Sequence, residues 1–209
     1  LILPEVREKL KGLEYVDSFV FNPHKWLFTN FDCSAFFMRD PACLARALSL
    51  TPTYLESVAD DQTPEYRDWS VALGRRFRAL KLWFVLRSYG AEGLRTMVRN
   101  HIAWTRQLAG LIADSPDFEL TTQPSLALLS FRYKPEWAAT DTELDSINEE
   151  LLRRVNDSGR LYLSKTRANG RIVIRFMIGQ TYTTLEHVQD GWASVEQLAR
   201  EIRQTKAPM

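Results

Sequence analysis

One lysine inside an apolar stretch constrains this chain more than any other feature. Lys25 lies within Val20–Phe28, where most of the neighbouring side chains are aromatic or aliphatic. Lysine is rarely buried unless it is paired or chemically used, and desolvation lowers the pKa of its amine. A neutral amine can form a Schiff base with an aldehyde. Because Pro23 favours an extended backbone at Asn22, we predict a strand end or turn that presents Lys25 to a cleft.

Two neighbours of this lysine carry short hydrogen-bonding groups. Asn22 and His24 could each hold an anionic or carbonyl-bearing ligand beside the amine of Lys25. The simpler interpretation is that Lys25 lays its aliphatic stem on apolar neighbours and keeps its ammonium in water. The segment by itself leaves both interpretations open.

Three further motifs follow this segment in order along the chain. They are Asn30-Phe31-Asp32-Cys33-Ser34, Thr51-Pro52-Thr53-Tyr54-Leu55 and Leu73-Gly74-Arg75-Arg76-Phe77-Arg78-Ala79-Leu80-Lys81-Leu82-Trp83. Together with Asn22-Pro23-His24-Lys25-Trp26, they resemble the group II pyridoxal-phosphate-dependent decarboxylases, and most closely the aromatic-L-amino-acid decarboxylases. The resemblance runs from about Pro4 to the last expected helix. It implies that the chain is the carboxy-terminal part of a longer polypeptide.

The resemblance implies a role for each of four residues near the cofactor. Lys25 would be the Schiff-base lysine for pyridoxal 5'-phosphate, with His24 near the ring or phosphate and Asn22 helping to hold the phosphate. Tyr54 would lie on a mobile lid and donate a proton to the α-carbon of the substrate. Taken alone, a loop tyrosine more often packs its ring on the surface.

Two more residues are implied in substrate binding. Gly74 would lie near the substrate ring and could reach it from the neighbouring subunit of a homodimer, while Phe31 is one of several aromatic residues around the site. The cations that follow Gly74 suggest phosphate or nucleic acid at first sight. One basic turn is more often a solvated or ion-paired face, and no alternation of aromatic and basic residues continues it.

The implied activity is the decarboxylation of aromatic L-amino acids to amines, which is a carboxy-lyase reaction. An aldehyde synthase or an acidic amino acid decarboxylase of the same family is the alternative, and Tyr54 weighs against the plant aldehyde synthase type. A third possibility is a dimerisation or binding module without activity. The aspartate expected at the pyridine nitrogen and the histidine expected over the ring are not found in this sequence, so we expect the chain alone to be inactive.

Composition excludes several other functions. The formal net charge is +1 over 209 residues, which provides no general field for nucleic acid. No run of about eighteen apolar residues occurs, so no membrane span is expected. Cys33 and Cys43 are not in a C-x-x-C arrangement and have no clustered histidines, which argues against a metal site and fits reduced thiols in a cytoplasmic protein.

The first half of the chain is expected to mix strands and helices around the lysine. We predict a short helix over 5–13, strands over 15–21 and 34–38 with the second buried, an irregular stretch over 44–59, and helices over 75–89 and 94–112 separated by Gly90 and Gly93. His101 on the latter helix has no partner nearby in the sequence, and we interpret it as a packing or surface residue.

The second half has the signals of a small α/β unit. Strands are predicted over 118–122, 125–133, 159–165 and 171–178, with Asn169-Gly170 as a hairpin turn between the last two. Thr140 with Glu143 and Thr183 with Glu186 are expected to cap helices that extend to about Asn156 and Ile202.

The fold class expected from these elements and the resemblance is α/β. It comprises the end of a large aspartate-aminotransferase-like (fold type I) domain followed by a small α/β carboxy-terminal domain. The predicted divisions are the end of the cofactor-binding domain over 1–48, a mobile catalytic loop over 49–62, connecting helices over 63–113 and the small domain over 114–209.

Overall fold

The computed structural model describes residues 2–49, 65–138 and 140–206. The chain divides into two compact units, Leu1–Arg95 and Thr96–Met209, and the division falls within helix α2 (Arg78–Ala113). The four divisions expected from the sequence remain a prediction.

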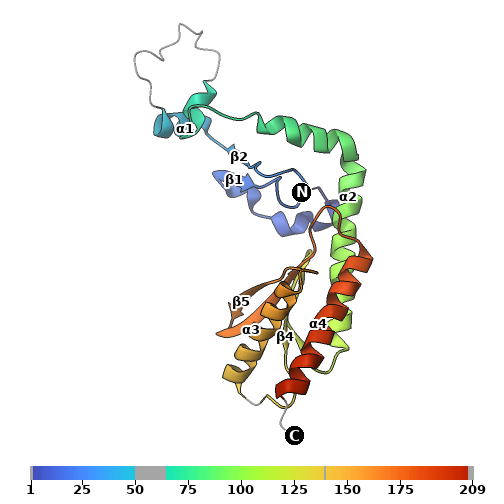
Figure 1. Ribbon diagram of the computed structural model, residues 1–209. Helices are drawn as coiled ribbons and strands as arrows, with labels where there is room; N and C mark the ends of the chain where they lie inside the picture. Colours follow the sequence, from blue (N-terminus) through green and yellow to red (C-terminus); the bar gives the residue numbers. More distant parts are fainter. Residues whose placement is uncertain (1, 50–64, 139, 207–209) are drawn as a thin grey trace. The chain divides into compact units, whose positions relative to one another are not determined.

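The first unit is built on a two-stranded antiparallel sheet (Figure 1). Strand β1 (Ser18–Phe21) pairs with β2 (Ala35–Met38), so that Ser18 lies opposite Met38 and Phe21 lies opposite Ala35. The expected pair of neighbouring strands is confirmed. Two short 3-10 helices, η1 (Pro4–Leu10) and η2 (Leu13–Tyr15), precede β1 where one short helix was predicted.

The prediction that the second strand is buried is wrong for this structure. Phe36 and Phe37 are each more than half exposed. Successive residues of a strand point to opposite faces, so neither face of the β1–β2 sheet is covered by described residues at this position. The apolar pattern of the strand therefore predicted a burial that the described residues do not provide.

A short helix, α1 (Pro41–Leu48), occupies part of the stretch that was expected to be irregular. Asp40 is its N-cap and accepts a hydrogen bond from the backbone N–H of Ala42 at 3.0 Å. Pro41 occupies the first turn, where its missing N–H costs nothing. The capping residues indicate the helix better than its periodicity does, because eight residues complete little more than two turns.

Helix α2 is interrupted at Gly90, which has φ 64° and ψ 173°. A left-handed φ of this kind is readily adopted only by glycine, so the predicted break at Gly90 is confirmed. The prediction that Gly93 also ends the helix is wrong, because Gly93 continues the second helical segment. The 3-10 helix η4 (Tyr66–Trp69) lies before α2 in the chain.

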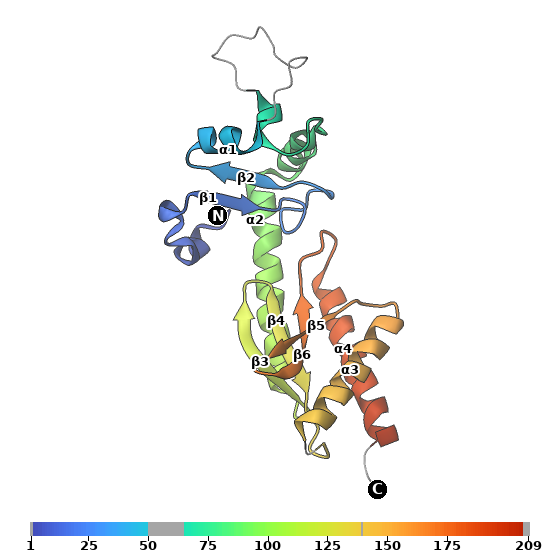
Figure 2. The same ribbon diagram turned by 90° about the vertical axis from the view of Figure 1, so that its left-hand side faces the viewer.

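The second unit is a four-stranded antiparallel sheet with two helices beside it (Figure 2). The strands lie in the order β3-β4-β6-β5. Their bounds, with those of the helices, are β3 Phe118–Ser125, β4 Leu128–Tyr133, α3 Asp141–Asp157, β5 Ser164–Ala168, β6 Arg171–Met177 and α4 Leu185–Lys206. Asn169 and Gly170 both have positive φ in the β5–β6 turn, as expected for this hairpin sequence.

The core of this unit lies between the sheet, helices α3 and α4 and the end of α2. Trp192 of α4 packs edge-on against Phe131 of β4, with ring centroids 5.5 Å apart. The hydroxyl of Tyr133 donates a hydrogen bond to the backbone oxygen of Ala199 at 3.3 Å. Apolar side chains from every layer therefore meet in one continuous core.

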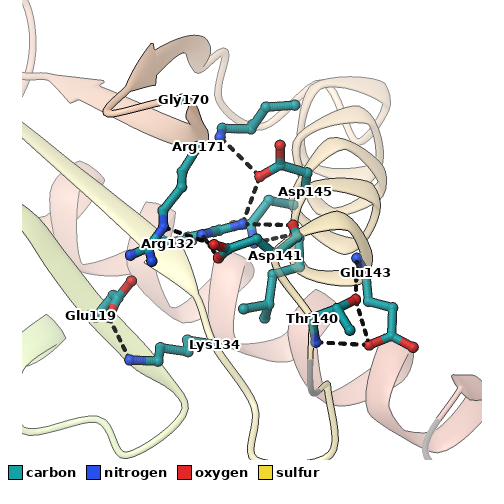
Figure 3. Close-up of polar contacts among 12 residues, drawn as sticks. Glu119, Arg132, Lys134, Thr140, Asp141, Glu143, Asp145, Gly170 and Arg171 are labelled. Atoms are coloured by element: carbon teal, nitrogen blue, oxygen red, sulfur yellow. Dashed lines mark hydrogen bonds and ion pairs between the residues drawn. The ribbon is translucent and has the colours of Figure 1, made fainter.

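Hydrogen bonds and ion pairs of polar side chains connect α3 to the sheet beside this core. The amide of Asn148 accepts from the backbone N–H of Tyr133 and donates to its carbonyl, both at 2.8 Å, as a neighbouring strand would. Arg132 is 1% exposed and donates to Asp141 at 3.1 Å and to Asp145 at 2.6 Å (Figure 3). Buried polar groups are tolerated when they are paired in this way.

The N-terminal cap of α3 agrees with the prediction, and that of α4 differs from it by one residue. Thr140 and Glu143 form both arms of the predicted capping box at the start of α3. At α4, Thr184 accepts from the N–H of His187, and Nδ1 of His187 accepts from the N–H of Thr184, each at 3.3 Å. The predicted box of Thr183 with Glu186 is therefore wrong by one residue.

None of the described helices is both long enough and apolar enough to span a membrane.

Candidate active site

The turn that carries Lys25 follows directly from the end of strand β1. The backbone N–H of Lys25 donates to the carbonyl of Asn22 at 2.9 Å, and the N–H of Thr29 donates to the carbonyl of Pro23 at 3.1 Å. Phe28 has a left-handed φ of 56°, which turns the chain toward the next segment. These contacts hold the backbone on both sides of Lys25.

The side chain of Lys25 is exposed in this structure. The apolar run around it therefore does not bury the amine among the described residues, although the sequence favoured a desolvated lysine. Phe28 and Thr29 are the buried members of the stretch that follows it. The amine is accessible to a ligand, and any apolar enclosure must come from outside the described residues.

His24 ties this turn to the loop before β2. Its Nδ1 lies 3.0 Å from the backbone nitrogen of Cys33 and 2.7 Å from the backbone oxygen of the same residue. The backbone N–H of His24 also donates to the carbonyl of Cys33 at 3.2 Å. The ring of Phe31 meets the His24 ring edge-on with centroids 4.9 Å apart. The imidazole is thus held by one backbone unit and one aromatic ring.

Asn22 and Phe31 are two further residues that were expected at the site. The Oδ1 of Asn22 accepts from the hydroxyl of Ser34 at 2.6 Å. Because the oxygen is engaged in this way, the NH2 is the group that Asn22 could offer to an anion. Phe31 is 83% exposed, so its ring is available to a planar ligand.

Asp32 is a site neighbour that the sequence reasoning did not single out. Its carboxylate binds Arg76 Nη2 at 2.8 Å and Arg78 Nε at 2.9 Å. The hydrogen bond from Arg78 lowers the pKa of Asp32, and the charges of Arg76 and Arg78 act in the same direction. The expected ion-paired face of the basic turn is therefore formed, with Asp32 as its partner. In the sequence, Asp32 was noted only as part of the motif Asn30-Phe31-Asp32-Cys33-Ser34.

Gly74 and Tyr54 complete the set of residues expected from the sequence. Gly74 is exposed, and a Cβ built on it would meet nothing within 4 Å. The described residues therefore show no close approach that requires a glycine there. Tyr54 lies outside the described residues, so its place relative to Lys25 stays a prediction.

The arrangement offers the groups that an aldehyde cofactor with a phosphate would need. Lys25 supplies an exposed primary amine, His24 supplies a ring, and Asn22 supplies an amide whose oxygen is engaged by Ser34. Amines condense with aldehydes, and amide N–H donors bind phosphate oxygens. The described residues around Lys25 fit one edge of such a group.

A comparison with protein families assigns the chain to a known family. Residues 1–134 match the model of the pyridoxal-dependent decarboxylase conserved domain. The chain belongs to the pyridoxal-dependent decarboxylase family. The matched residues include the Lys25 turn, the Asp32 loop and the start of α2.

Individual relatives of this family agree with that assignment. The chain is 41% identical to tyrosine decarboxylase 1 of Narcissus pseudonarcissus over 208 residues, covering 96% of this chain and 40% of the relative. It is 42% identical to a phenylacetaldehyde synthase of Arabidopsis thaliana over 200 residues, covering 95% of this chain and 41% of that protein. The chain thus spans about two fifths of the length of these relatives.

A solved structure shows the same fold over nearly the whole chain. The crystal structure of Oryza sativa TDC with PLP and tryptamine superposes with a TM-score of 0.90 at 36% sequence identity. The match covers 95% of this chain and 42% of the Oryza sativa chain. The expected α/β fold, the end of a fold type I domain followed by a small α/β domain, is confirmed.

Proposed function

We propose that this chain is part of an enzyme that decarboxylates aromatic L-amino acids to amines with pyridoxal 5'-phosphate. The observation that carries the proposal is the exposed amine of Lys25, on a turn held by His24 and Cys33, inside the segment that matches the family. A tyrosine decarboxylase and a structure with PLP and tryptamine are among the similar proteins. The first is named for tyrosine, an aromatic amino acid, and the second was solved with tryptamine, an aromatic amine.

Lys25 is the residue to which the cofactor would be attached, through its Nζ. When bound, pyridoxal phosphate supplies an electron sink for the bond that is broken at the α-carbon. His24 would lie against the cofactor ring, since its imidazole is already fixed by Cys33 and Phe31. Asn22, held by Ser34, would donate to the phosphate. The rest of the cofactor pocket would come from outside the described residues.

Tyr54 is the residue we propose to protonate the α-carbon after carbon dioxide leaves. A phenol placed at that carbon would direct the reaction to the amine. The surrounding segment 49–62 would close over the site and exclude water, and Gly74 and Phe31 would bound the side chain of the substrate.

The attachment of the cofactor can be tested on the full-length enzyme. Reduction of the purified holoenzyme with borohydride, followed by peptide mapping, should place the cofactor label on the peptide that contains Lys25. Lys25→Ala should lower decarboxylase activity by about a thousandfold or more, because the attachment point is lost. Lys11→Ala, a surface lysine paired with Glu8, is the matched control and should keep both label and activity. Label on any other lysine would refute the assignment.

An aldehyde synthase is the second candidate, because a phenylacetaldehyde synthase is as similar to the chain as the tyrosine decarboxylase is. The two reactions differ in their products. A decarboxylase yields an amine and carbon dioxide, whereas an aldehyde synthase consumes dioxygen and water and yields an aldehyde, carbon dioxide, ammonia and hydrogen peroxide. We expect amine from the parent enzyme and a shift toward aldehyde from Tyr54→Phe. Amine yield unchanged in Tyr54→Phe would remove Tyr54 from the mechanism.

We also propose that the complete enzyme is a homodimer. Large apolar side chains are exposed between η4 and the first turns of α2, and they include Val71, Leu73, Phe77 and Phe84. Exposed apolar patches of this kind mark interaction surfaces. Analytical ultracentrifugation of the full-length enzyme should give a molecular mass twice that of one full-length polypeptide. A monomer that retains full activity would exclude the dimer as a requirement.

A further inference from the structure

Asp32 joins two segments that are far apart in the sequence but meet beside the Lys25 turn. Its two carboxylate oxygens are shared between two cations of the same segment, Oδ1 with Arg76 Nη2 at 2.8 Å and Oδ2 with Arg78 Nε at 2.9 Å. The side chain of Asp32 is 28% exposed. An ion pair that uses both oxygens fixes direction as well as distance.

A second contact runs beside this ion pair. The thiol of Cys33 donates to the backbone oxygen of Arg78 at 3.8 Å, within the range of sulfur hydrogen bonds. Cys33 is 4% exposed, so the contact is shielded from water. Residues 32 and 33 are therefore held together against the start of α2.

The same residues continue to the lysine. The backbone of Cys33 holds His24 through Nδ1 and through the His24 N–H, at 3.0 and 3.2 Å. His24 immediately precedes Lys25, whose own N–H is held by Asn22 at 2.9 Å. A continuous series of contacts thus runs from the arginines through Asp32 and Cys33 to the turn that carries the amine.

We propose that Asp32 is a positioning residue, whose ion pairs with Arg76 and Arg78 set the orientation of His24 and Lys25 relative to the start of α2. This inference rests on the proposed function, because the orientation matters only if Lys25 and His24 hold the cofactor. Asp32 itself would not touch the reacting atoms. It acts through Cys33, and its loss should misplace the cofactor rather than release it.

The test uses the full-length holoenzyme and the variants Asp32→Asn and Asp32→Glu. In Asp32→Asn we expect stoichiometric cofactor and an unchanged melting temperature, with kcat lowered by about 10- to 100-fold and KM changed by less than about twofold. The cofactor absorbance band should also shift, which a purely structural role would not cause. Asp32→Glu keeps the charge and should recover part of kcat. Asp157→Asn, which removes a surface ion pair with Arg153, is the matched control and should leave kcat and the band unchanged.

A double-mutant cycle separates positioning from general damage. Arg78→Gln should lower kcat by no more than Asp32→Asn does, because it removes one of the two ion pairs of Asp32. The double variant should be no worse than Asp32→Asn alone, because that variant has already lost the interaction with Arg78. Arg78→Lys, which keeps the charge but loses the Nε contact, provides the same test if Asp32→Asn does not fold.

Three results would overturn the inference. Parental kcat and an unchanged band in Asp32→Asn would show that the ion pairs have no part in the reaction, while the proposed function stands. Loss of cofactor together with a lowered melting temperature in every variant would make Asp32 only structural. A parent enzyme that binds no cofactor would remove the proposed function, and this inference with it.

Discussion

The two units of this chain bury their apolar side chains to very different extents. In the second unit, Phe131, Leu151 and Val195 are fully buried in one core. In the first unit, Val20, Phe36, Phe77 and other large apolar side chains are more than half exposed. Both units have similar strand and helix signals in the sequence. The difference shows that an apolar pattern reports what a segment needs to bury, and not whether its partner is present.

This difference has a functional counterpart. The residues proposed to hold the cofactor, Asn22, His24 and Lys25, all lie in the unit with the open apolar surface. The unit with the complete core contains none of the residues expected in the site. A site formed between several pieces of protein leaves each piece with exposed apolar surface, whereas a supporting domain can complete its own core.

The strongest test of the comparison is to separate the units. Residues 96–209, expressed alone, should unfold in urea as a single cooperative transition, because the piece retains the whole buried core. Residues 1–95 alone should show no such transition, since many of their described apolar side chains are exposed. Far-UV circular dichroism against urea concentration measures both. A cooperative transition in 1–95 would show that its exposed side chains are no obstacle to folding.

A matched pair of phenylalanine substitutions tests the same contrast inside the 209-residue chain. Phe131→Ala should lower the free energy of unfolding of the second unit by about 3 to 5 kcal/mol, because it removes a buried ring and leaves a cavity. Phe36→Ala removes an exposed ring from the first unit and should change the free energy of unfolding of the second unit by less than about 0.5 kcal/mol. Urea titration followed by tryptophan fluorescence measures both. Equal effects would contradict the difference in burial.

The polar contact between α3 and β4 should have a smaller effect. Asn148→Ala leaves the backbone N–H and carbonyl of Tyr133 without the side chain that pairs them. We expect a loss of about 2 to 3 kcal/mol from buried groups left unpaired. Gln197→Ala, on the exposed face of α4, serves as the control in the same urea titration. Stability equal to the control would mean that water replaces the amide at no cost.

The smallest expected effect is a dependence of the second unit on pH. His101 is 2% exposed, and burial lowers its pKa. The unfolded chain therefore binds a proton that the folded chain does not, and the free energy of unfolding should fall as the pH drops through the ordinary histidine range. In His101→Gln this part of the slope should disappear. Urea midpoints of residues 96–209 measured from neutral to mildly acidic pH give the comparison.

The structure supports the expected packing role of His101, and several other elements were also predictable from local signals. The capping box of Thr140 with Glu143 and the Asn169-Gly170 turn depend on neighbouring residues alone, so the sequence contains all the information they need. The cap of α4 was misplaced by one residue, because Thr183 and Thr184 offer the same hydroxyl and only the backbone geometry distinguishes them.

The site was less predictable than the fold. The motif around Lys25 indicated the family and the chemistry, but it did not reveal that the amine is exposed within the described residues. Asp32 was missed as an interacting residue because its partners, Arg76 and Arg78, lie more than forty residues further along the chain. Contacts of this separation leave no periodic signal in the sequence.

The sequence by itself determined the family, the turn at Lys25 and most of the strands and helices of the second unit, because these depend on short motifs and local periodicity. Only the tertiary structure decided which apolar side chains are buried, and that Asp32 and Cys33 link the His24 turn to the start of α2. Burial and ion pairing depend on which distant surfaces meet, and residues that are close in space need not be close along the chain.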